Sequence, residues 1–202
     1  MWTNVVAVII FIRHGQSTSN ERGLLGGRSN SLLTELGRDQ ARRLTPYLEG
    51  VREVWASPLE RALSTARLAV PQCEPVVKES FIEVDYGTLD GQTMASITDD
   101  QWRQFEGDHV APLKDGESLE CVDQRVYAEM DRLFADPLSL LHREDEHLAI
   151  ISHVSPIKSA ATWALGVAGS AAWRMRIDNG SMTYIATRRS TPSLIRSNVV
   201  PI

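Results

Sequence analysis

Two arginines and two histidines stand close behind apolar segments of the chain. Arg13 and His14 follow the run VVAVIIFI, Arg61 comes soon after VREVWA, and His153 follows LAIIS. Guanidinium groups present forked N–H donors that match the oxygens of a phosphate group. If the fold brings these segment ends together, the residue types predict a binding site for a phosphoryl dianion.

A metal site is the weaker interpretation of the same residues. The histidines have no cluster of carboxylates or thiolates beside them in the sequence, and the neighbouring arginines would repel a cation. Cys73 and Cys121 show neither the spacing of metal ligands nor that of a redox pair. We therefore expect no metal, and two reduced thiols in the packed structure.

Buried strands would carry these residues to one edge of a sheet. Short runs rich in valine and isoleucine are typical of strands covered on both faces, which predicts strands over residues 5–12, 51–56 and 148–152. Helical patterns alternate with them, so the expected fold class is α/β: a three-layer α/β/α domain with a mostly parallel central sheet. Ligands bind at the carboxyl ends of the strands in such sheets.

Capping residues and helix breakers predict where the helices begin and end. Thr34 and Ser118 are expected to open helices, and Ser57 to cap a helix that begins at Pro58. Another helix is expected over residues 156–165. In the helices after Thr34 and Ser118, the predicted core-facing residues are Leu36, Ala41, Leu44, Leu48, Leu119, Val122, Val126, Met130 and Leu133, and the predicted ends are Pro46 and Asp136-Pro137.

Two further features complete the predicted domain. Residues 173–177 and 182–187 flank the turn signal Asp178-Asn179-Gly180 and are expected to form a strand hairpin near the end of the sheet. Between Tyr86 and Gly116 the periodicity weakens, and Gly, Asp, Gln, Thr and Pro dominate. We expect one domain over residues 1–202, with an excursion at about 86–117 that crosses one end of the sheet as a substrate lid.

Length and charge limit the classes of partner. The chain has 202 residues, of which 43% are hydrophobic, enough for one domain with a sizeable core. A formal net charge of -5 argues against broad binding to nucleic acid or anionic membranes. The apolar start has no basic segment before it and is too short to span a bilayer, which predicts a cytoplasmic protein. The oligomeric state stays open, a homodimer included.

Seven stretches make the chain resemble the histidine phosphatase superfamily, also called the phosphoglycerate mutase-like family. That family's marker is Arg-His-Gly at the end of the first strand, and the stretches follow the family's order over nearly the whole chain. They are RHGQSTSN (13–20), LLTELGRDQA (32–41), ASPLERALSTA (56–66), EVDYGTLDG (83–91), DGES (115–118), IISHVSPIK (150–158) and DNGSMTYI (178–185). The resemblance implies a phosphoglycerate mutase-like fold.

The resemblance also implies a role for each of five residues. His14 would accept the phosphoryl group and Glu83 would protonate the leaving group. Arg13, Arg61 and His153 match the family's phosphate-binding residues. Positive charge nearby, including a charged His153, would lower the pKa of His14 and leave its lone pair free.

Further contacts are implied around these five residues. The backbone carbonyl of Gly15 would fix the tautomer of the nucleophile, and Asp85 is the rival acid to Glu83. Substrate contacts are implied for Asn20, Gly26, Gly27 and the backbone N–H of Val154. Many relatives carry Gln at position 26 and Gly at position 154, so the contacts at 26 and the width of access beside His153 stay open.

These roles favour a phosphomonoester hydrolase that acts on a small phosphorylated metabolite through a phosphohistidine, without metal or cofactor. One alternative is a cofactor-dependent phosphoglycerate mutase, an isomerase, but residues 83–118 offer only Arg103 and Lys114 as strong cations for a second acidic group. The other is an inactive member that binds a phosphorylated ligand or a protein, which the presence of all five residues disfavours. Six side chains of the lid and the first loop favour a substrate with a polar or anionic organic part. They are the cations Arg22, Arg28, Arg103 and Lys114 and the rings of Trp102 and His109.

Overall fold

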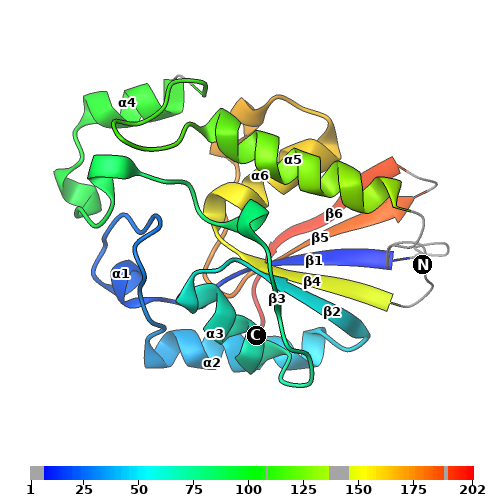
Figure 1. The fold of residues 1–202 in the computed structure, drawn as a ribbon. Coiled ribbons are helices and arrows are strands. Elements are labelled where there is room, and N and C mark those ends of the chain that lie inside the picture. The colour runs from blue at the N-terminus through cyan, green and yellow to red at the C-terminus, as the bar shows by residue number, and fades with distance from the viewer. Residues whose placement is uncertain (1–6, 108, 137–145, 189–190) are drawn as a thin grey trace.

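The centre of the molecule is a six-stranded sheet in the order β3-β2-β4-β1-β5-β6 (Figure 1). The computed structural model describes residues 7–107, 109–136, 146–188 and 191–202. The strands are β1 (Ala7–Arg13), β2 (Val51–Ala56), β3 (Val76–Val77), β4 (Glu146–Ser152), β5 (Met182–Arg188) and β6 (Thr191–Val199). The first four are parallel, whereas β5 and β6 are antiparallel to their neighbours. The predicted mostly parallel sheet is confirmed.

Helices cover both faces of this sheet. α2 (Glu35–Leu44) and α3 (Glu60–Ala69) lie on one face, and α5 (Leu119–Ala135) and α6 (Val154–Leu165) lie on the other (Figure 1). The predicted three-layer α/β/α architecture is therefore confirmed. The shorter helices are α1 (Thr18–Glu21), α4 (Asp99–Gly107) and the 3-10 turns η1 (Thr45–Tyr47), η2 (Glu79–Phe81), η3 (Gly87–Leu89), η4 (Met94–Ser96) and η6 (Gly169–Arg174).

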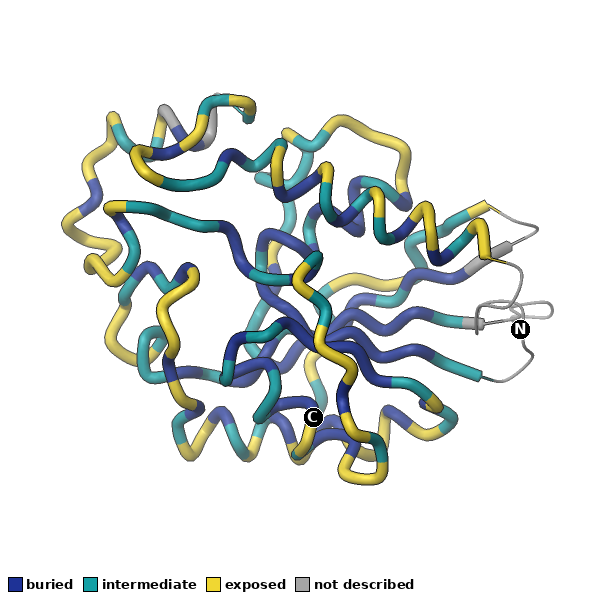
Figure 2. Tube along the Cα trace, in the orientation of Figure 1, coloured by how far each residue is buried: buried dark blue, intermediate teal, exposed yellow. Residues whose placement is uncertain are grey.

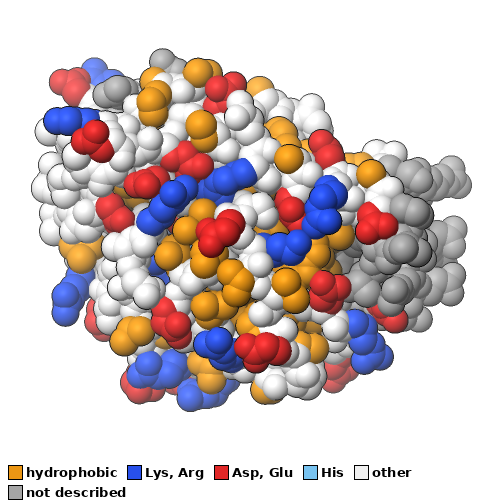
Figure 3. Space-filling view, viewed as in Figure 1, with side chains coloured by type: hydrophobic (Ala, Val, Ile, Leu, Met, Phe, Trp, Pro, Cys, Tyr) orange, Lys and Arg blue, Asp and Glu red, His pale blue; other side chains and the backbone are white. Residues whose placement is uncertain are grey.

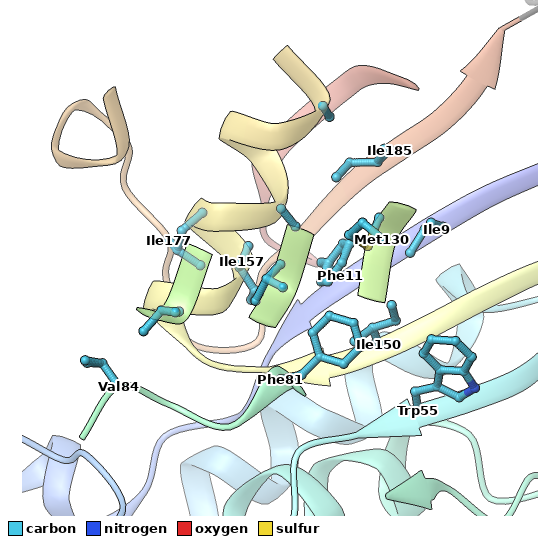
Figure 4. Close-up of a cluster of buried hydrophobic side chains, with 14 of the residues drawn as sticks. Ile9, Phe11, Trp55, Phe81, Val84, Met130, Ile150, Ile157, Ile177 and Ile185 are labelled. Atoms are coloured by element: carbon cyan, nitrogen blue, oxygen red, sulfur yellow. The ribbon is translucent and has the colours of Figure 1, made fainter. Parts of the chain in front are cut away.

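The continuous apolar run at the start of the chain is explained by two cores. Successive strand residues point to opposite faces, so Ile9 and Phe11 enter the core beneath α5 and α6, while Ile10 and Ile12 enter the core above α2 and α3. Figure 2 shows the central strands as the most deeply buried part of the chain, and Figure 4 shows Phe11 within the first of these cores. A strand covered on both faces needs no polar alternation.

Most predicted helix boundaries are confirmed, with three corrections. Thr34 and Ser118 cap α2 and α5, and Gly166 ends α6 in a left-handed conformation. Leu36 is 52% exposed instead of core-facing, because the buried stripe of α2 runs through Gly37, Ala41 and Leu44. α6 begins at Val154 rather than at Pro156, with His153 as its N-cap residue, since proline is tolerated in a first helical turn.

The third correction concerns the helix expected to begin at Pro58. α3 begins at Glu60 with Leu59 at the N-cap, and the Ser57 hydroxyl closes no capping box. That hydroxyl accepts from the Leu59 N–H at 3.3 Å and also lies 2.7 Å from Nε2 of His153. α5 ends at Ala135, while Pro137, which was expected to stop it, lies outside the described residues.

The predicted hairpin at the end of the sheet is wrong in one arm. β5 forms as expected, but residues 173–177 are not a strand: η6 ends at Arg174, and the chain then runs without a strand partner to the turn at 178–180. The outer partner of β5 is β6, which follows it in sequence. The turn signal at 178–180 predicted this arm, but of residues 173–177 only Ile177 is buried, and its carbonyl oxygen accepts from Nη1 of Arg13.

Residues 86–117 lie beyond the carboxyl ends of the parallel strands and include α4 (Figure 1). The surface seen in Figure 3 intersperses acidic and basic side chains rather than gathering one sign. Among the residues that the structure describes, none of the helices has both the length and the apolar character that a membrane span requires.

Candidate active site

Three strand ends meet at one edge of the sheet, as predicted. β1 and β4 are neighbours, and their register places Arg13 beside Ser152, so His14 and His153 leave the sheet side by side. Their ring centroids are 5.0 Å apart. Arg61 reaches the same point from the first turn of α3, and its guanidinium is buried. The structure therefore brings together the four residues from which a phosphate site was predicted.

His14 is held in one orientation by two hydrogen bonds. Its Nδ1 lies 2.7 Å from the carbonyl oxygen of Gly15, the contact that the resemblance implied. Because a carbonyl only accepts, Nδ1 carries the proton and Nε2 keeps a lone pair. Nε2 in turn accepts a hydrogen bond from Nε of Arg61 at 3.2 Å. Burial lowers the pKa of His14 well below its ordinary value, with Arg61 and Arg13 adding to the effect, so the imidazole is neutral.

The turn after β1 needs glycine for reasons of space. A Cβ on Gly15 would lie 2.2 Å from the carbonyl oxygen of Gly37, and a Cβ on Gly37 would lie 2.0 Å from that of Gln16. The backbone of this turn thus packs directly on the first turn of α2. This contact, with the Gly15 N–H donating to the Thr65 hydroxyl at 3.1 Å, positions the carbonyl that orients His14.

His153 is also uncharged, which corrects the expectation of a charged partner for His14. Burial lowers the pKa of His153 well below its ordinary value, and Arg61, His14 and Arg13 lower it further. Nε2 of His153 contacts the Ser57 hydroxyl, whereas its Nδ1 is buried and has no hydrogen-bond partner among the described residues. The sequence missed Ser57 as a ligand of this ring because the Ser-Pro pair resembled a helix start.

Two buried neutral histidines predict a specific dependence of stability on pH. The folded-state pKa of His14 and of His153 is lowered, so below about pH 6.5 the unfolded chain binds protons that the folded chain does not. The free energy of unfolding should therefore fall as the pH drops, by about 1.4 kcal/mol per pH unit for each histidine. Urea unfolding between about pH 6.5 and pH 5 measures this slope.

A variant separates this effect from the titration of carboxylates. His153→Gln removes one of the two histidines while the carboxyl groups stay the same, so its slope should be shallower than that of the wild type by about one proton's contribution. Equal slopes for the two proteins would show that His153 titrates alike in the folded and unfolded states.

Arg61 connects the nucleophile to the loop that holds Gly26 and Gly27. Its Nη2 donates to the Gly27 carbonyl at 2.6 Å and its Nη1 to the Ser29 carbonyl at 2.9 Å. Gly27 has no room for a side chain, since a Cβ would lie 2.9 Å from the ring of Tyr86. The two glycines thus contact Arg61 through the loop backbone, and Gly26 also lines the adjoining pocket.

Glu83 is fixed by backbone donors at the start of α6. Its Oε1 accepts from the N–H groups of Val84 at 2.9 Å and Ser155 at 3.2 Å, and its Oε2 accepts from that of Val154 at 3.1 Å. The Val154 N–H, expected to contact substrate, is thus bound to Glu83. Asp85, the rival acid, instead forms an ion pair with Arg28 and is not among the residues that line the pocket.

Asn20 and Arg13 complete the wall of the site. Oδ1 of Asn20 accepts from Nδ2 of Asn179 at 3.1 Å, and the same Nδ2 donates to the His14 carbonyl. Nη1 of Arg13 donates to the Ile177 carbonyl at 2.7 Å, whereas its buried Nε has no partner among the described residues. Asn179 was read only as a turn residue in the sequence, and the structure shows that it ties Asn20 to the nucleophile's backbone.

A pocket of about 470 Å³ opens beside these residues. Arg13, Asn20 and Glu83 line it, together with an apolar wall that includes Tyr86, Met94, Trp102, Phe105, Trp173 and Met175. Of the residues expected to bind a polar substrate body, Trp102 and His109 line the pocket, but Arg22, Arg28, Arg103 and Lys114 do not. Arg28 instead pairs with Glu117, and Arg103 pairs with Asp100. Within the described ranges, no group of three potential metal ligands occurs.

Two curated relatives cover most of this chain and most of their own length. A protein named probable phosphoglycerate mutase GpmB, from Enterobacter sp. (strain 638), is 29% identical over 190 residues, 90% of this chain and 86% of that protein. Phosphoserine phosphatase 1 from Hydrogenobacter thermophilus is 29% identical over 199 residues, 95% of this chain and 92% of that protein. The chain spans about half the length, 49%, of three mycobacterial relatives that are 30% identical over 183 residues.

A solved structure shares the fold of this chain, and a family model matches most of its length. A phosphoserine phosphatase from Entamoeba histolytica, solved in complex with 3-phosphoglyceric acid, has a similar fold, with a TM-score of 0.84 at 24% identity over 96% of this chain and 98% of that one. The model of the histidine phosphatase superfamily (branch 1) matches residues 9–200. That match includes all the strand ends described above, and the chain belongs to the histidine phosphatase superfamily.

Proposed function

We propose that this protein is a phosphomonoester hydrolase that transfers the phosphoryl group of a small phosphorylated metabolite to His14 and then to water. The observation that carries the proposal is the state of His14. Its Nδ1 proton is held by the Gly15 carbonyl, its Nε2 lone pair faces Arg61, and its pKa is lowered by burial. A buried neutral imidazole of fixed tautomer is suited to nucleophilic attack.

In the first step, Nε2 of His14 attacks phosphorus, the ester P–O bond breaks, and Glu83 gives a proton to the leaving oxygen. Arg61 then donates to a phosphate oxygen instead of to Nε2. Arg13 and His153 each have a buried nitrogen that lacks a partner among the described residues, and both supply further donors to the phosphoryl oxygens. The Ser57 hydroxyl donates to Nε2 of His153, so the neutral ring carries its proton on Nδ1 and donates from there. Such donors stabilise the charge on the transferring group.

In the second step, water attacks the phosphohistidine. Glu83 takes a proton from that water, the P–N bond breaks, and inorganic phosphate leaves with His14 restored to its neutral form. No step needs a metal ion, because Arg13, Arg61 and His153 supply the donors to the transferred charge. The hydrogen bonds that Val84, Val154 and Ser155 donate to Glu83 keep its carboxyl group at the pocket wall for both proton transfers.

A mutase would return the phosphoryl group to the bound product instead of to water, and relatives carry both kinds of name. It must hold a second acidic group and exclude water meanwhile. Arg103 and Lys114 lie outside the pocket, and Arg176, which lines it, pairs with Asp178. We therefore expect 3-phosphoglycerate, if accepted, to yield free phosphate much faster than 2-phosphoglycerate, with or without added 2,3-bisphosphoglycerate.

Phosphorus NMR of one reaction mixture follows both products together and tests this expectation. Interconversion of the two monophosphates about tenfold faster than phosphate release, a difference of about 1.4 kcal/mol between the two barriers, would assign the mutase activity instead. Binding of inorganic phosphate without turnover of any monoester would assign the inactive, ligand-binding alternative.

A further inference from the structure

We infer that the alcohol part of the substrate carries an aromatic ring, which the pocket binds along the wall formed by Tyr86, Trp102, Phe105 and Trp173. This inference rests on the proposed hydrolase function and names the class of monoester that the site selects. The four rings come from two separate parts of the chain: the excursion at 86–117, with α4, and the turn η6. All four line the same pocket as Arg13 and Glu83.

The rings form one continuous cluster with Phe105 in the middle. The Phe105 centroid lies 5.6 Å from that of Tyr86, 6.4 Å from that of Trp102 and 5.2 Å from that of Trp173. Phe105 is buried and meets Trp173 edge to face, whereas Trp102 and Trp173 are only partly buried. Partly buried rings around a buried one leave apolar surface open to a ligand, and a further ring can add edge-to-face or stacked contacts of the same kind.

The polar side chains of the pocket argue against an aliphatic chain as the occupant. Asp123 accepts from His109 at 2.6 Å and from the Ser159 hydroxyl at 2.5 Å, and all three line the pocket. Ser159 lies one turn beyond Ser155 on α6, about 6 Å further along the helix from its N-terminal end, where the Glu83 carboxyl group is bound. An aromatic ring has an edge of partial positive charge that can face the Asp123 carboxylate, whereas an aliphatic chain has no such edge.

The size of the pocket argues against a small acid such as phosphoserine. A volume of about 470 Å³ lies in the range of about 300–1,000 Å³ that suits ring-bearing ligands of moderate size. Two cations that line the pocket have partners within the protein: Arg176 pairs with Asp178 at 2.8 Å, and Nζ of Lys158 lies 5.5 Å from the ring centroid of Trp173. A three-carbon acid would leave most of the aromatic wall uncovered.

Three monoesters with primary alcohol leaving groups test the inference: phenethyl, cyclohexylethyl and ethyl phosphate. The three alcohols are similar in acidity, so differences in kcat/KM between the esters report how well the pocket binds the organic group of each ester. We expect kcat/KM for phenethyl phosphate to exceed that for ethyl phosphate by about a hundredfold, from burial of the ring. It should exceed that for cyclohexylethyl phosphate by about fivefold, although cyclohexane is the more apolar ring.

A pair of tryptophan variants assigns the preference to the wall. In Trp173→Ala, the ratio of kcat/KM for phenethyl over ethyl phosphate should fall about tenfold. Trp163→Ala is the matched control: Trp163 lies on α6, packs on Phe134 at 4.8 Å between ring centroids, and is not among the pocket-lining residues. Its ratio should equal that of the wild type.

The outcomes separate this inference from the proposed function. If the kcat/KM for ethyl phosphate or for cyclohexylethyl phosphate equals that for phenethyl phosphate, the inference of an aromatic substrate is wrong, while the proposed hydrolase activity is unaffected. An unchanged ratio in Trp173→Ala would likewise overturn the assignment of the wall. If none of the three esters, nor any other monoester, releases phosphate, the hydrolase itself is wrong.

Discussion

Replacing His14 with alanine should abolish phosphate release and the covalent intermediate together. The lone pair on Nε2 of His14 faces Arg61, so this variant removes the nucleophile of the proposed mechanism. We expect kcat to fall by at least about four powers of ten. Quenching the wild-type reaction in alkali during turnover of a radiolabelled substrate should trap an acid-labile phosphoryl group on His14, and none on the variant.

The chain offers a matched control for this experiment. His147 is a partly buried histidine on β4, and its register partner is Val8, at the other end of the strands from the pocket. His147→Ala should keep both the label and the turnover. A label on any side chain other than His14, or turnover by His14→Ala at the wild-type rate, would end the phosphohistidine mechanism.

Arg61→Ala should lower kcat/KM by about three powers of ten, because a single preorganised donor to transferring oxygens contributes about two to three powers of ten. Removal of this buried side chain should also destabilise the folded protein. The carbonyl oxygens of Gly27 and Ser29 would lose their buried donors, so the melting temperature should fall as well. Kinetics must therefore be measured at a temperature where circular dichroism shows the variant folded.

Arg67→Ala is the control, since Arg67 lies on the same helix with an exposed side chain that pairs with Glu74. It should retain the wild-type kcat/KM, and inorganic phosphate should inhibit it as it inhibits the wild type. A folded Arg61→Ala protein within about threefold of the wild-type kcat/KM would contradict the proposed role, because the loss of such a contact costs several kcal/mol.

The sequence predicted the meeting of the strand ends for a simple physical reason. A run such as Val5 to Ile12 is apolar on both faces only if it is central in a sheet, and central parallel strands deliver their following residues to one edge. Arg13, His14 and His153 were therefore placed correctly before any side-chain geometry was known. The same holds for Arg61, whose place in a first helical turn follows from the strand before it.

Features that depend on distant partners could not be predicted in this way. The turn signal at 178–180 predicts a strand from Trp173 to Ile177, but Trp173 packs on Phe105 and the Ile177 carbonyl accepts from Arg13 instead. The neutral state of His153 follows from a pKa that is lowered by burial and further by Arg61, His14, Arg13 and Arg125, which no local pattern encodes. Arg103 and Lys114 looked like substrate ligands because their side-chain directions were unknown.

Glu83 precedes the excursion in sequence but is bonded to the start of α6 in space. Its two carboxyl oxygens accept from the N–H groups of Val154 and Ser155, the residues that directly follow His153. A rigid-body displacement of α6 would therefore carry the proton donor and the His153 imidazole as one mechanical block. The spacing between the Glu83 carboxyl group and the His153 ring is therefore set by the start of α6 rather than by the excursion at 86–117.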